Sequence, residues 1–413
     1  MRRVIHISQP KKYAIFQRSI LMLLTSQTSQ LEAAATARSH HTIIHIQDDR
    51  NHSTPHVKNT KTLSWLGVFR VATLVSIVVF LSSLFTLHYL KKSIFHMHRQ
   101  HMGGIVFPDP VYSSSDDRIH FVVVGDFGRG NEVQKSVSQA MAEYCEKNVC
   151  DFIVGTGDNV YPNGVTSLED EQFETKFEDM YPQQILKDLD WYMSLGNHDY
   201  RGDTRAQIEY SRKSKRWILP DYYYEFKKKS KMGSFDLQFI VTDTIPLNPV
   251  FYRDPLINRS STIFERQKEM PGQMEWLENH LKNHNPRGKN SWTIVIGHNP
   301  VYSAGRHYDS QPLIELFEPL FKKYQVPLYL CGHDHVVNWL SNQHISNEKE
   351  RTQYVISGAG GGHTDKMLKY NPNLMNYYIG DGGFFSVEVQ KTFMFIRSFN
   401  EKGKEIFKFR IDK

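Results

Sequence analysis

The chain has 413 residues, of which 40% are apolar and 23% are charged, and it carries a formal net charge of +6 at pH 7. This apolar content is sufficient for a hydrophobic core and excludes a wholly disordered chain, while the length allows two or three ordinary domains or one large domain with an appendage. The densest basic cluster, residues 227–231, has no interleaved aromatic residues. We therefore interpret it as a solvated loop and expect no nucleic-acid partner, although a basic surface favours anionic substrates.

Three cysteines are present: Cys145, Cys150 and Cys331. None forms a CxxC pair, which argues against a zinc knuckle. Cys145 and Cys150 could pair in an oxidising compartment or could both remain free, and the sequence leaves both possibilities open. We expect Cys331, which ends an apolar run, to be a small core residue.

The amino-terminal part of the chain has three predicted regions. Residues 1–60 are polar and lack sustained periodicity, which is typical of a disordered tail. Residues 71–90 contain no charge and would rise about 30 Å as a helix, enough to cross a bilayer. Since no small-residue cleavage site follows, we interpret residues 68–91 as a transmembrane signal anchor rather than a signal peptide, with a juxtamembrane linker at 92–117.

From residue 118 to residue 413 strands and helices alternate. We predict strands, each with a polar loop after it, within residues 119–128, 151–159, 189–199, 235–244, 291–300, 326–335, 354–362 and 382–399, and helices within residues 133–147, 169–181 and 313–325. This order specifies a layered α/β domain, in which ligands bind at the loops that follow the carboxyl ends of strands.

Five of the predicted strands end in glycine followed by a residue that can bind a metal, in GDFG, GDNVY, GNHD, GHNP and GHDH. The candidate ligands are Asp126, Asp158, Tyr161, Asn197, His298, His333 and His335. Glycine allows a sharp turn and close approach of the backbone, and the strand behind it fixes the ligand's position. One such motif is a weak signal, but five in series provide enough ligands for two metal ions and indicate a two-metal phosphoester hydrolase.

These motifs resemble those of the calcineurin-like metallophosphoesterase superfamily and, within it, the purple acid phosphatases, over residues 118–413. Most members of the superfamily have a histidine ligand where this chain has Gly128, and purple acid phosphatases instead have a tyrosine three residues after the second aspartate, where this chain has Tyr161. The stretch AQIEYSRKSKRW at 206–217 resembles the small mammalian, tartrate-resistant type. The resemblance implies an α/β fold, a four-layer α/β/β/α sandwich, here preceded by the single transmembrane helix.

The resemblance also implies the ligands of each ion. One ion, Fe(III), is expected at Asp126, Asp158, Tyr161 and His335, and a divalent ion, Fe, Zn or Mn, at Asp158, Asn197, His298 and His333. Phenolate is a hard donor that favours a trivalent ion, while the sequence does not choose among the divalent metals. A carboxylate shared by both ions would screen their repulsion at a separation of about 3.5–4 Å.

The implied activity is that of an acid phosphatase that hydrolyses phosphate monoesters by direct attack of a metal-bound hydroxide, without a covalent phospho-enzyme. We expect two catalytic residues, His198 and His307, and three substrate-binding residues, Asn197, His198 and His307. His198 is expected beside the leaving-group oxygen, where it donates a proton or a hydrogen bond; the alternative is that it only orients the ligand shell. His307 matches a family histidine that lines the substrate site; the alternative is a surface loop histidine.

Four further features have expected roles outside the metal set. Asp199 is expected to be a structural partner of its loop, and Asp243 to support a strand end. The glycines at 358 and 360–362 fit a tight strand-end turn better than a phosphate cradle. Residues 247–270 are longer and more charged than a minimal loop, and could cover the mouth of the site or form a surface insertion.

Two rival functions remain. A phosphodiesterase or nucleotide hydrolase could use the same metal site, and paired kinetics on a monoester and a diester would separate the two. A non-catalytic membrane receptor or scaffold would be expected to have lost a ligand or His198, and neither is lost. We expect small phosphomonoester or phosphoprotein substrates and a monomeric protein.

An Fe(III)-tyrosinate centre and an acid optimum suit a secretory, vacuolar or extracellular setting. The glycosylation sequons at Asn51 and Asn258 lie on opposite sides of the anchor, so a single-pass protein cannot use both. Basic residues flank both ends of the anchor almost equally. We predict a type II protein, with its tail in the cytoplasm and its catalytic domain in the lumen.

Overall fold

The computed structural model describes residues 76, 117–259, 262–362, 371–378 and 380–413. The predicted tail lies outside these residues, and so do the anchor apart from Ser76 and the linker apart from Asp117. Within the part of the chain that the structure describes, no helix is long and apolar enough to cross a membrane.

Two seven-stranded sheets form the centre of the described domain. The first has the order β14-β13-β12-β1-β2-β3-β4, with β1 Arg118–Val124, β2 Phe152–Gly155, β3 Trp191–Met193, β4 Trp217–Ile218, β12 Gly383–Gln390, β13 Phe393–Asn400 and β14 Glu405–Asp412. The second has the order β11-β9-β10-β8-β7-β6-β5, with β5 Tyr224–Lys229, β6 Asp236–Val241, β7 Ser291–Ile296, β8 Leu328–Cys331, β9 Val337–Ser341, β10 Gln353–Ser357 and β11 Leu374–Tyr378. Strands β1 to β4 pair in parallel, as do β6, β7, β8 and β10.

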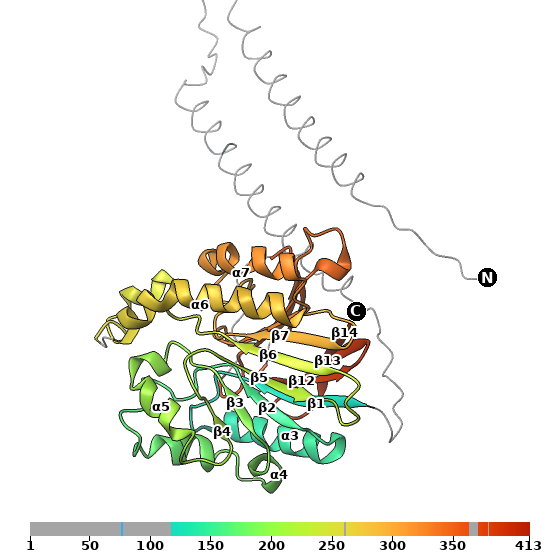
Figure 1. Cartoon of the computed structure of the whole chain (residues 1–413). Coiled ribbons are helices and arrows are strands. Elements are labelled where there is room, and N and C mark those ends of the chain that lie inside the picture. The colour runs from blue at the N-terminus through green and yellow to red at the C-terminus, as the bar shows by residue number, and fades with distance from the viewer. Residues whose placement is uncertain (1–75, 77–116, 260–261, 363–370, 379) are drawn as a thin grey trace, which may run out of the picture. The chain divides into compact units, whose positions relative to one another are not determined.

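Helices cover the outer faces of the two sheets, as Figure 1 shows. The helical elements are α3 Glu132–Asn148, η1 Glu174–Glu178, α4 Gln184–Lys187, η2 Asp199–Arg201, α5 Thr204–Tyr210, η3 Pro249–Arg253, α6 Thr262–His284, α7 Gln311–Tyr324 and η4 Glu348–Glu350. Helix α3 contacts the first sheet at β12, and α6 contacts the second at β6 and β7. The two-sheet α/β fold that the sequence predicts is therefore confirmed.

The core between the sheets is aromatic. Phe121 and Phe152 from the first sheet stack with their ring centroids 5.0 Å apart, and Phe239 of the second sheet packs edge-on against Phe121 at 5.3 Å. On the other face of the second sheet, α7 buries Phe317 and Phe321, which are four residues apart and therefore lie on one side of the helix. Packing on both faces of the second sheet fixes the positions of the strand ends, from which the polar loops extend.

Most predicted elements occur, with three differences. The basic cluster at 227–231, expected to be a solvated loop, instead has its first three residues in strand β5. The predicted helix at 169–181 is shortened to the π-helical stretch η1, in which the Asp179 N–H donates to the Glu174 carbonyl at 2.9 Å. Residues 262–270, expected to belong to a loop, instead begin the long helix α6. Its buried residues are few (Ile263, Gln273, Leu277 and Leu281), which explains why its apolar pattern is weak in the sequence.

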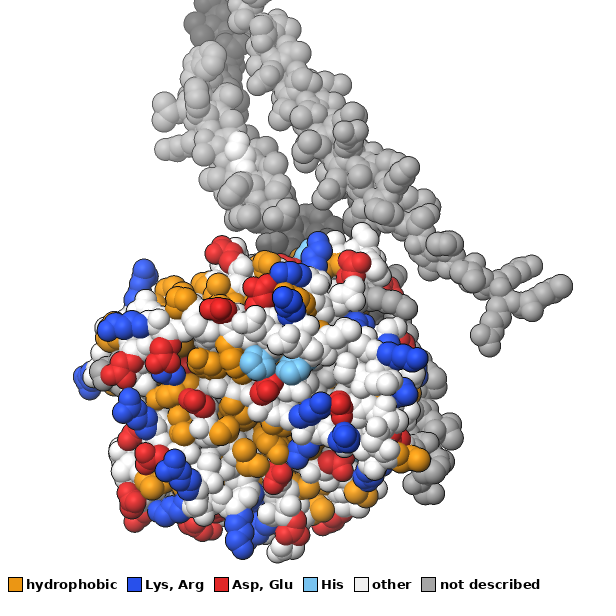
Figure 2. Space-filling model, viewed as in Figure 1, with side chains coloured by type: hydrophobic (Ala, Val, Ile, Leu, Met, Phe, Trp, Pro, Cys, Tyr) orange, Lys and Arg blue, Asp and Glu red, His pale blue; other side chains and the backbone are white. Residues whose placement is uncertain are grey.

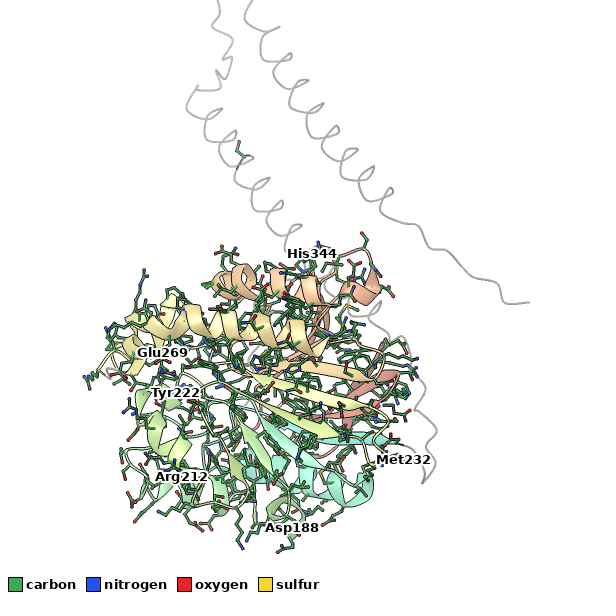
Figure 3. All side chains as sticks on the ribbon, viewed as in Figure 1. Asp188, Arg212, Tyr222, Met232, Glu269 and His344 are labelled. Atoms are coloured by element: carbon green, nitrogen blue, oxygen red, sulfur yellow. A yellow bond between two sulfur atoms is a disulfide. The ribbon has the colours of Figure 1, made fainter. Side chains whose placement is uncertain are left out.

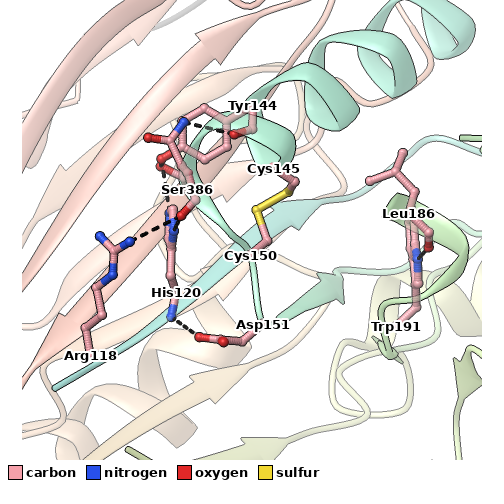
Figure 4. Close-up of a disulfide and its surroundings, with 10 residues drawn as sticks. Arg118, His120, Tyr144, Cys145, Cys150, Asp151, Leu186, Trp191 and Ser386 are labelled. Carbon is pink, nitrogen blue, oxygen red and sulfur yellow. Dashed lines mark hydrogen bonds between the residues drawn. A yellow bond between two sulfur atoms is a disulfide. The ribbon is translucent and has the colours of Figure 1, made fainter. Parts of the chain in front are cut away.

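The pairing that the sequence left open occurs: Cys145 and Cys150 form a disulfide, with their Cα atoms 5.0 Å apart. It joins the last turn of α3 to the start of β2, beside the buried His120 and half-buried Tyr144 side chains (Figure 4). Cys331 is free and buried, as expected. Disulfides persist in oxidising compartments, so this bond is consistent with a lumenal or extracellular domain.

Replacing both Cys145 and Cys150 with serine is expected to lower the free energy of unfolding by about 2 kcal/mol, because the bond closes a short loop in the unfolded chain. Denaturant unfolding of the full chain measures the change. Reductant should destabilise the wild type by a similar amount and leave the double variant unchanged. A wild type that is insensitive to reductant would contradict the prediction.

Candidate metal centre

The predicted ligands lie at strand ends from both sheets. Asp126 follows β1, Asp158 follows β2 and Asn197 follows β3, while His298 follows β7 and His333 follows β8. Three of these residues, Asp126, Asp158 and His333, have φ angles of 57°, 54° and 69°. Side chains other than glycine rarely adopt this left-handed conformation, and it clusters at functional sites.

Two glycines next to these strand ends leave no room for a side chain. A Cβ atom at Gly196 would lie 2.2 Å from Asp158 Oδ1, and one at Gly332 would lie 2.3 Å from Asp126 Oδ2. The glycine before each ligand therefore permits the backbone to approach a neighbouring carboxylate, as the sequence pattern predicted.

One group of predicted ligands surrounds the Tyr161 hydroxyl. Tyr161 Oη lies 3.0 Å from Asp126 Oδ1, 2.8 Å from Asp158 Oδ2 and 3.1 Å from His335 Nε2. His335 Nε2 is also 3.6 Å from Asp126 Oδ1. Four side chains from three separate loops thus direct one oxygen or nitrogen each to the same point.

The other group surrounds His298. Its Nε2 lies 3.2 Å from Asn197 Oδ1 and 3.5 Å from Asp158 Oδ1, and its Nδ1 lies 2.8 Å from the Thr156 carbonyl. The His333 ring centroid is 5.1 Å from that of His298. Asp158 therefore has Oδ2 in the group around Tyr161 and Oδ1 in the group around His298.

Burial and mutual repulsion shape the acids of the site. Burial and the Asp158 carboxylate raise the pKa of Asp126 well above its usual range. Burial also opposes ionisation of Asp158, but His298 and His198 outweigh it and hold the pKa of Asp158 below its usual value. Burial, Asp126 and Asp158 raise the pKa of Tyr161 well above its usual range.

The surroundings of the imidazoles oppose their protonation. Burial lowers the pKa of His298, and burial together with the other histidines lowers that of His333 well below its usual value. Burial and Arg129 lower the pKa of His335 to about 4. Neutral imidazoles, crowded carboxylates and a phenol form a donor set that fits metal cations, which would favour the deprotonated form of each acid.

His198 borders both groups of ligands. Its backbone N–H donates to Asp158 Oδ1 at 2.8 Å, its Nε2 lies 4.0 Å from Asp158 Oδ2, and its ring centroid is 4.3 Å from that of Tyr161. Its Nδ1 lies 2.6 Å from the Pro162 carbonyl and 2.9 Å from Arg201 Nη1. His198 Nδ1–H can donate a hydrogen bond to the Pro162 carbonyl, and Nε2 then faces the site.

His307 is exposed, and its ring lies over that of His333 with the centroids 4.0 Å apart. Its backbone N–H donates to Asp334 Oδ1 at 2.8 Å, and the other Asp334 oxygen accepts a short hydrogen bond from Ser303. Both histidines line a cavity of about 330 Å³, together with residues that include Asn248. His307 therefore lies at the mouth of the site rather than on a remote loop.

Three neighbours of the site were not identified from the sequence. Arg129 places its guanidinium 4.0 Å above the Tyr161 ring and 3.5 Å from His335 Nε2. Arg201 contacts His198, and Asp334 anchors the His307 backbone. Arg129 and Asp334 lie within or next to the motifs GDFG and GHDH, which is a signal that could have drawn attention to them.

The remaining predicted features lie around the site. Asp199 accepts hydrogen bonds from the Gly196, Asn159 and Val160 backbone and from Gln207, so it supports its loop. Asp243 accepts a short hydrogen bond from Tyr200 and lies at the end of β6. A Cβ atom at positions 358, 360 or 361 would lie less than 3.0 Å from another segment's backbone, which agrees with a tight strand-end turn.

The amino-terminal end of the segment 247–270 reaches the site. The Phe251 ring packs edge-on against His333 at 5.7 Å, and Asp254 accepts two hydrogen bonds from Arg201, at 2.9 and 3.1 Å. Because Arg201 contacts His198, the segment is connected to both groups of ligands. Its later residues belong to α6.

Comparisons with known proteins agree with this geometry. The family model described as calcineurin-like phosphoesterase matches residues 119–337. Tartrate-resistant acid phosphatase type 5 of Oryctolagus cuniculus is 30% identical over 316 residues, covering 71% of this chain and 91% of the relative, and purple acid phosphatase 3 of Arabidopsis thaliana is 34% identical, covering 68% and 74%. A solved structure described as GAP50, the anchor in the inner membrane complex of Plasmodium, shares the fold, with a TM-score of 0.61, 21% identity and coverage of 72% and 89%.

Proposed function

Because the chain belongs to the calcineurin-like phosphoesterase family, and its relatives are tartrate-resistant and purple acid phosphatases, it is a phosphatase with a binuclear metal centre, and we propose that it hydrolyses phosphate monoesters in acid. The observation that carries the proposal is the position of Asp158. One of its oxygens lies 2.8 Å from Tyr161 Oη and the other 3.5 Å from His298 Nε2. A carboxylate in that position can serve two ions at once.

The two groups of side chains suggest the ligands of each ion. In this proposal one ion has the ligands Asp126, Asp158, Tyr161 and His335, and the other has Asp158, Asn197, His298 and His333. The phenolate supports Fe(III) in the first position, and the imidazole and amide donors support Fe(II), Zn(II) or Mn(II) in the second. When bound, the two ions would supply an acidified water and positive charge beside the phosphoryl oxygens.

Replacing Tyr161 with phenylalanine is expected to abolish a visible absorption band of the purified full chain, because a phenolate bound to Fe(III) is the source of the colour. Absorption spectra with metal analysis test this. Tyr224→Phe, at another fully buried tyrosine, should keep the band because its hydroxyl bonds only to backbone carbonyls of Met193 and Ile218. A colourless wild type that holds only zinc or manganese would overturn the iron assignment.

The protein's own side chains would bind and orient the substrate. Asn197 and His198 border the space between the ion positions from one loop, and His307 borders it from another. His198 Nε2 faces this space while Nδ1 contacts the Pro162 carbonyl, so the ring protonated at both nitrogens would present an Nε2 proton to the leaving-group oxygen. His307, supported by Asp334, would contact the substrate from the cavity side.

Replacing His198 with alanine is expected to lower kcat for an alkyl phosphate more than for p-nitrophenyl phosphate. A positioned acid contributes about 10²–10⁴-fold, and its loss matters most when the leaving group needs a proton. Steady-state kinetics on both substrates, with metal content measured in parallel, give the comparison. Equal losses on both substrates would indicate that His198 only orients the ligand shell.

Kinetics on different substrates distinguish the proposed monoesterase from the rival activities. Exposure of His307 at the mouth supports access by varied monoesters, phosphoproteins included. A larger kcat/KM for a diester such as bis-p-nitrophenyl phosphate than for its monoester would favour the phosphodiesterase or nucleotide hydrolase. The similarity to a structure described as a membrane anchor concerns the fold alone, and the complete ligand set supports a catalytic protein over a receptor.

The membrane assignment is part of the same proposal. We place a single transmembrane anchor at 68–91 and the domain at 118–413 in the secretory or vacuolar lumen or outside the cell. The disulfide and the exposed Asn258 side chain of the sequon support this orientation. Glycosylation at Asn51 instead of Asn258, read by mass spectrometry, would reverse it.

A further inference from the structure

A second cluster of possible metal ligands lies apart from the catalytic loops. It consists of Glu225 on β5 and His280 and His284 on α6, whose ligand atoms all lie within 4.8 Å of one another. His280 Nε2 is 3.4 Å and His284 Nε2 2.8 Å from Glu225 Oε2. Figure 2 shows histidine side chains gathered next to acidic ones on the surface below α6.

Regular structure brings these residues together. His280 and His284 are four residues apart, so they lie on one face of α6 near its carboxyl end. Glu225 lies on the edge strand of the second sheet, which α6 covers at β6 and β7. The cluster therefore ties two elements that are separated by more than fifty residues in the chain.

Two neighbouring groups orient the ligands. His280 Nδ1 lies 2.7 Å from the Trp276 carbonyl one turn earlier, and the Trp276 ring packs against the imidazole with centroids 4.3 Å apart. Gln238 on β6 donates its amide N–H to Glu225 Oε2 at 2.7 Å. Partners of this kind set the tautomer and direction of metal ligands.

The orientation of His280 calls for a positive charge in the cluster. A carbonyl only accepts, so His280 Nδ1 carries the proton that bonds to Trp276. In the neutral ring, Nε2 then has a lone pair, and this lone pair faces the lone pairs of Glu225 Oε2 at 3.4 Å. A proton on Nε2 or a metal ion between the two atoms relieves this contact.

We propose that Glu225, His280 and His284 form a third metal site, which takes Zn²⁺ or a similar borderline dication. Imidazole and carboxylate ligands suit zinc rather than calcium or magnesium. With zinc–ligand distances of about 2.0–2.1 Å, tetrahedral ligands lie roughly 3.4 Å apart, close to the separation of His280 and Glu225. His284 would move away from Glu225 by roughly half an ångström, and water would occupy the fourth position.

Solvent reaches the proposed site, and an ion there would stabilise the fold rather than take part in catalysis. The side chains of Glu225, His280 and His284 are 39%, 23% and 25% exposed, so an ion reaches them from solvent. The ion joins the end of α6 to the edge strand β5, and an ion that binds only the folded chain raises its stability. The segment before α6 contacts Arg201 and His333, so the helix that this site secures also continues the wall of the catalytic centre.

The test is a zinc titration of the full chain with its catalytic ions already bound. Equilibrium dialysis with metal analysis is expected to show one more zinc per chain in the wild type than in Glu225→Gln, His280→Gln or His284→Gln. Zinc should also raise the melting temperature of the wild type but not of these variants. Phosphatase activity and circular dichroism show that each variant is folded, since none of the three residues belongs to the catalytic centre.

The matched control is His344→Gln. His344 pairs with a single carboxylate, Glu318, at 2.7 Å, and lies near α7 (Figure 3). This variant should keep the additional zinc and the rise in melting temperature. The proposal is overturned if the wild type takes up no zinc beyond that of the three variants, which would mean that a proton occupies the cluster, or if the variants retain it. The zinc increment is read independently of which metals the catalytic centre holds.

Discussion

Replacing Asp158 with asparagine is expected to lower kcat/KM by more than about 100-fold and to reduce the metal content of the chain from two ions. Substitutions of groups that merely support metal ligands cost about 10–100-fold, and a carboxylate with one oxygen in each group of ligands should cost more. Asparagine keeps the shape of the side chain but removes the charge that screens the two cations. Metal analysis and steady-state kinetics of the purified full chain measure both effects.

Asp243→Asn provides the matched control for that substitution. Asp243 is also a buried carboxylate at a strand end, where burial raises its pKa to about 7, and it bonds to Tyr200 rather than to the predicted ligands. This variant should keep two ions and most of the activity. If Asp158→Asn retained both ions, the assignment of Asp158 as the shared ligand would be wrong.

Replacing Gly128 with alanine is expected to lower the free energy of unfolding by about 3 kcal/mol or more. A Cβ atom at this position would lie 1.7 Å from the Asn159 carbonyl oxygen and 2.7 Å from the Val160 nitrogen. Both contacts are to backbone of the loop that carries Asp158, so no side chain can rotate away and the loop itself must move. Denaturant unfolding measures the loss, and the visible spectrum reports displacement of Tyr161.

Gly272→Ala is the corresponding control at a position with free space around it. Nothing lies within 4 Å of a Cβ atom there, and the residue is inside α6. Alanine is expected to stabilise the helix by roughly 0.5–1 kcal/mol, because glycine loses more conformational freedom on folding. Equal destabilisation by the two substitutions would show that the contact with Asn159 does not limit position 128.

The same contact shows that position 128 of this chain has no room for a side chain. The sequence has Gly128, where the resemblance to the superfamily implies a histidine, and Tyr161, but it did not show how the two positions are related. In the structure the Tyr161 N–H donates to the Gly128 carbonyl at 2.8 Å, so the two loops touch at this point. A histidine at 128 would have to displace the backbone next to Asp158.

The sequence by itself determined the α/β class and the candidate ligands. Strand periodicity and glycine-terminated motifs are local signals, because a buried strand and a sharp turn depend on residues next to one another. The same reasoning did not identify β14, which pairs antiparallel with β13, or α6, whose buried face contains few apolar residues.

Only the tertiary structure decided which distant groups meet. It chose the Cys145–Cys150 bond from two possibilities that the sequence allowed, set Arg129 above Tyr161, and brought Glu225 to His280 and His284. These contacts depend on how sheets and helices pack, and packing is decided by the whole core rather than by the residues that finally touch. Local patterns in this sequence therefore indicate which residues can act, whereas the packing of its two sheets and covering helices determines which of them act together.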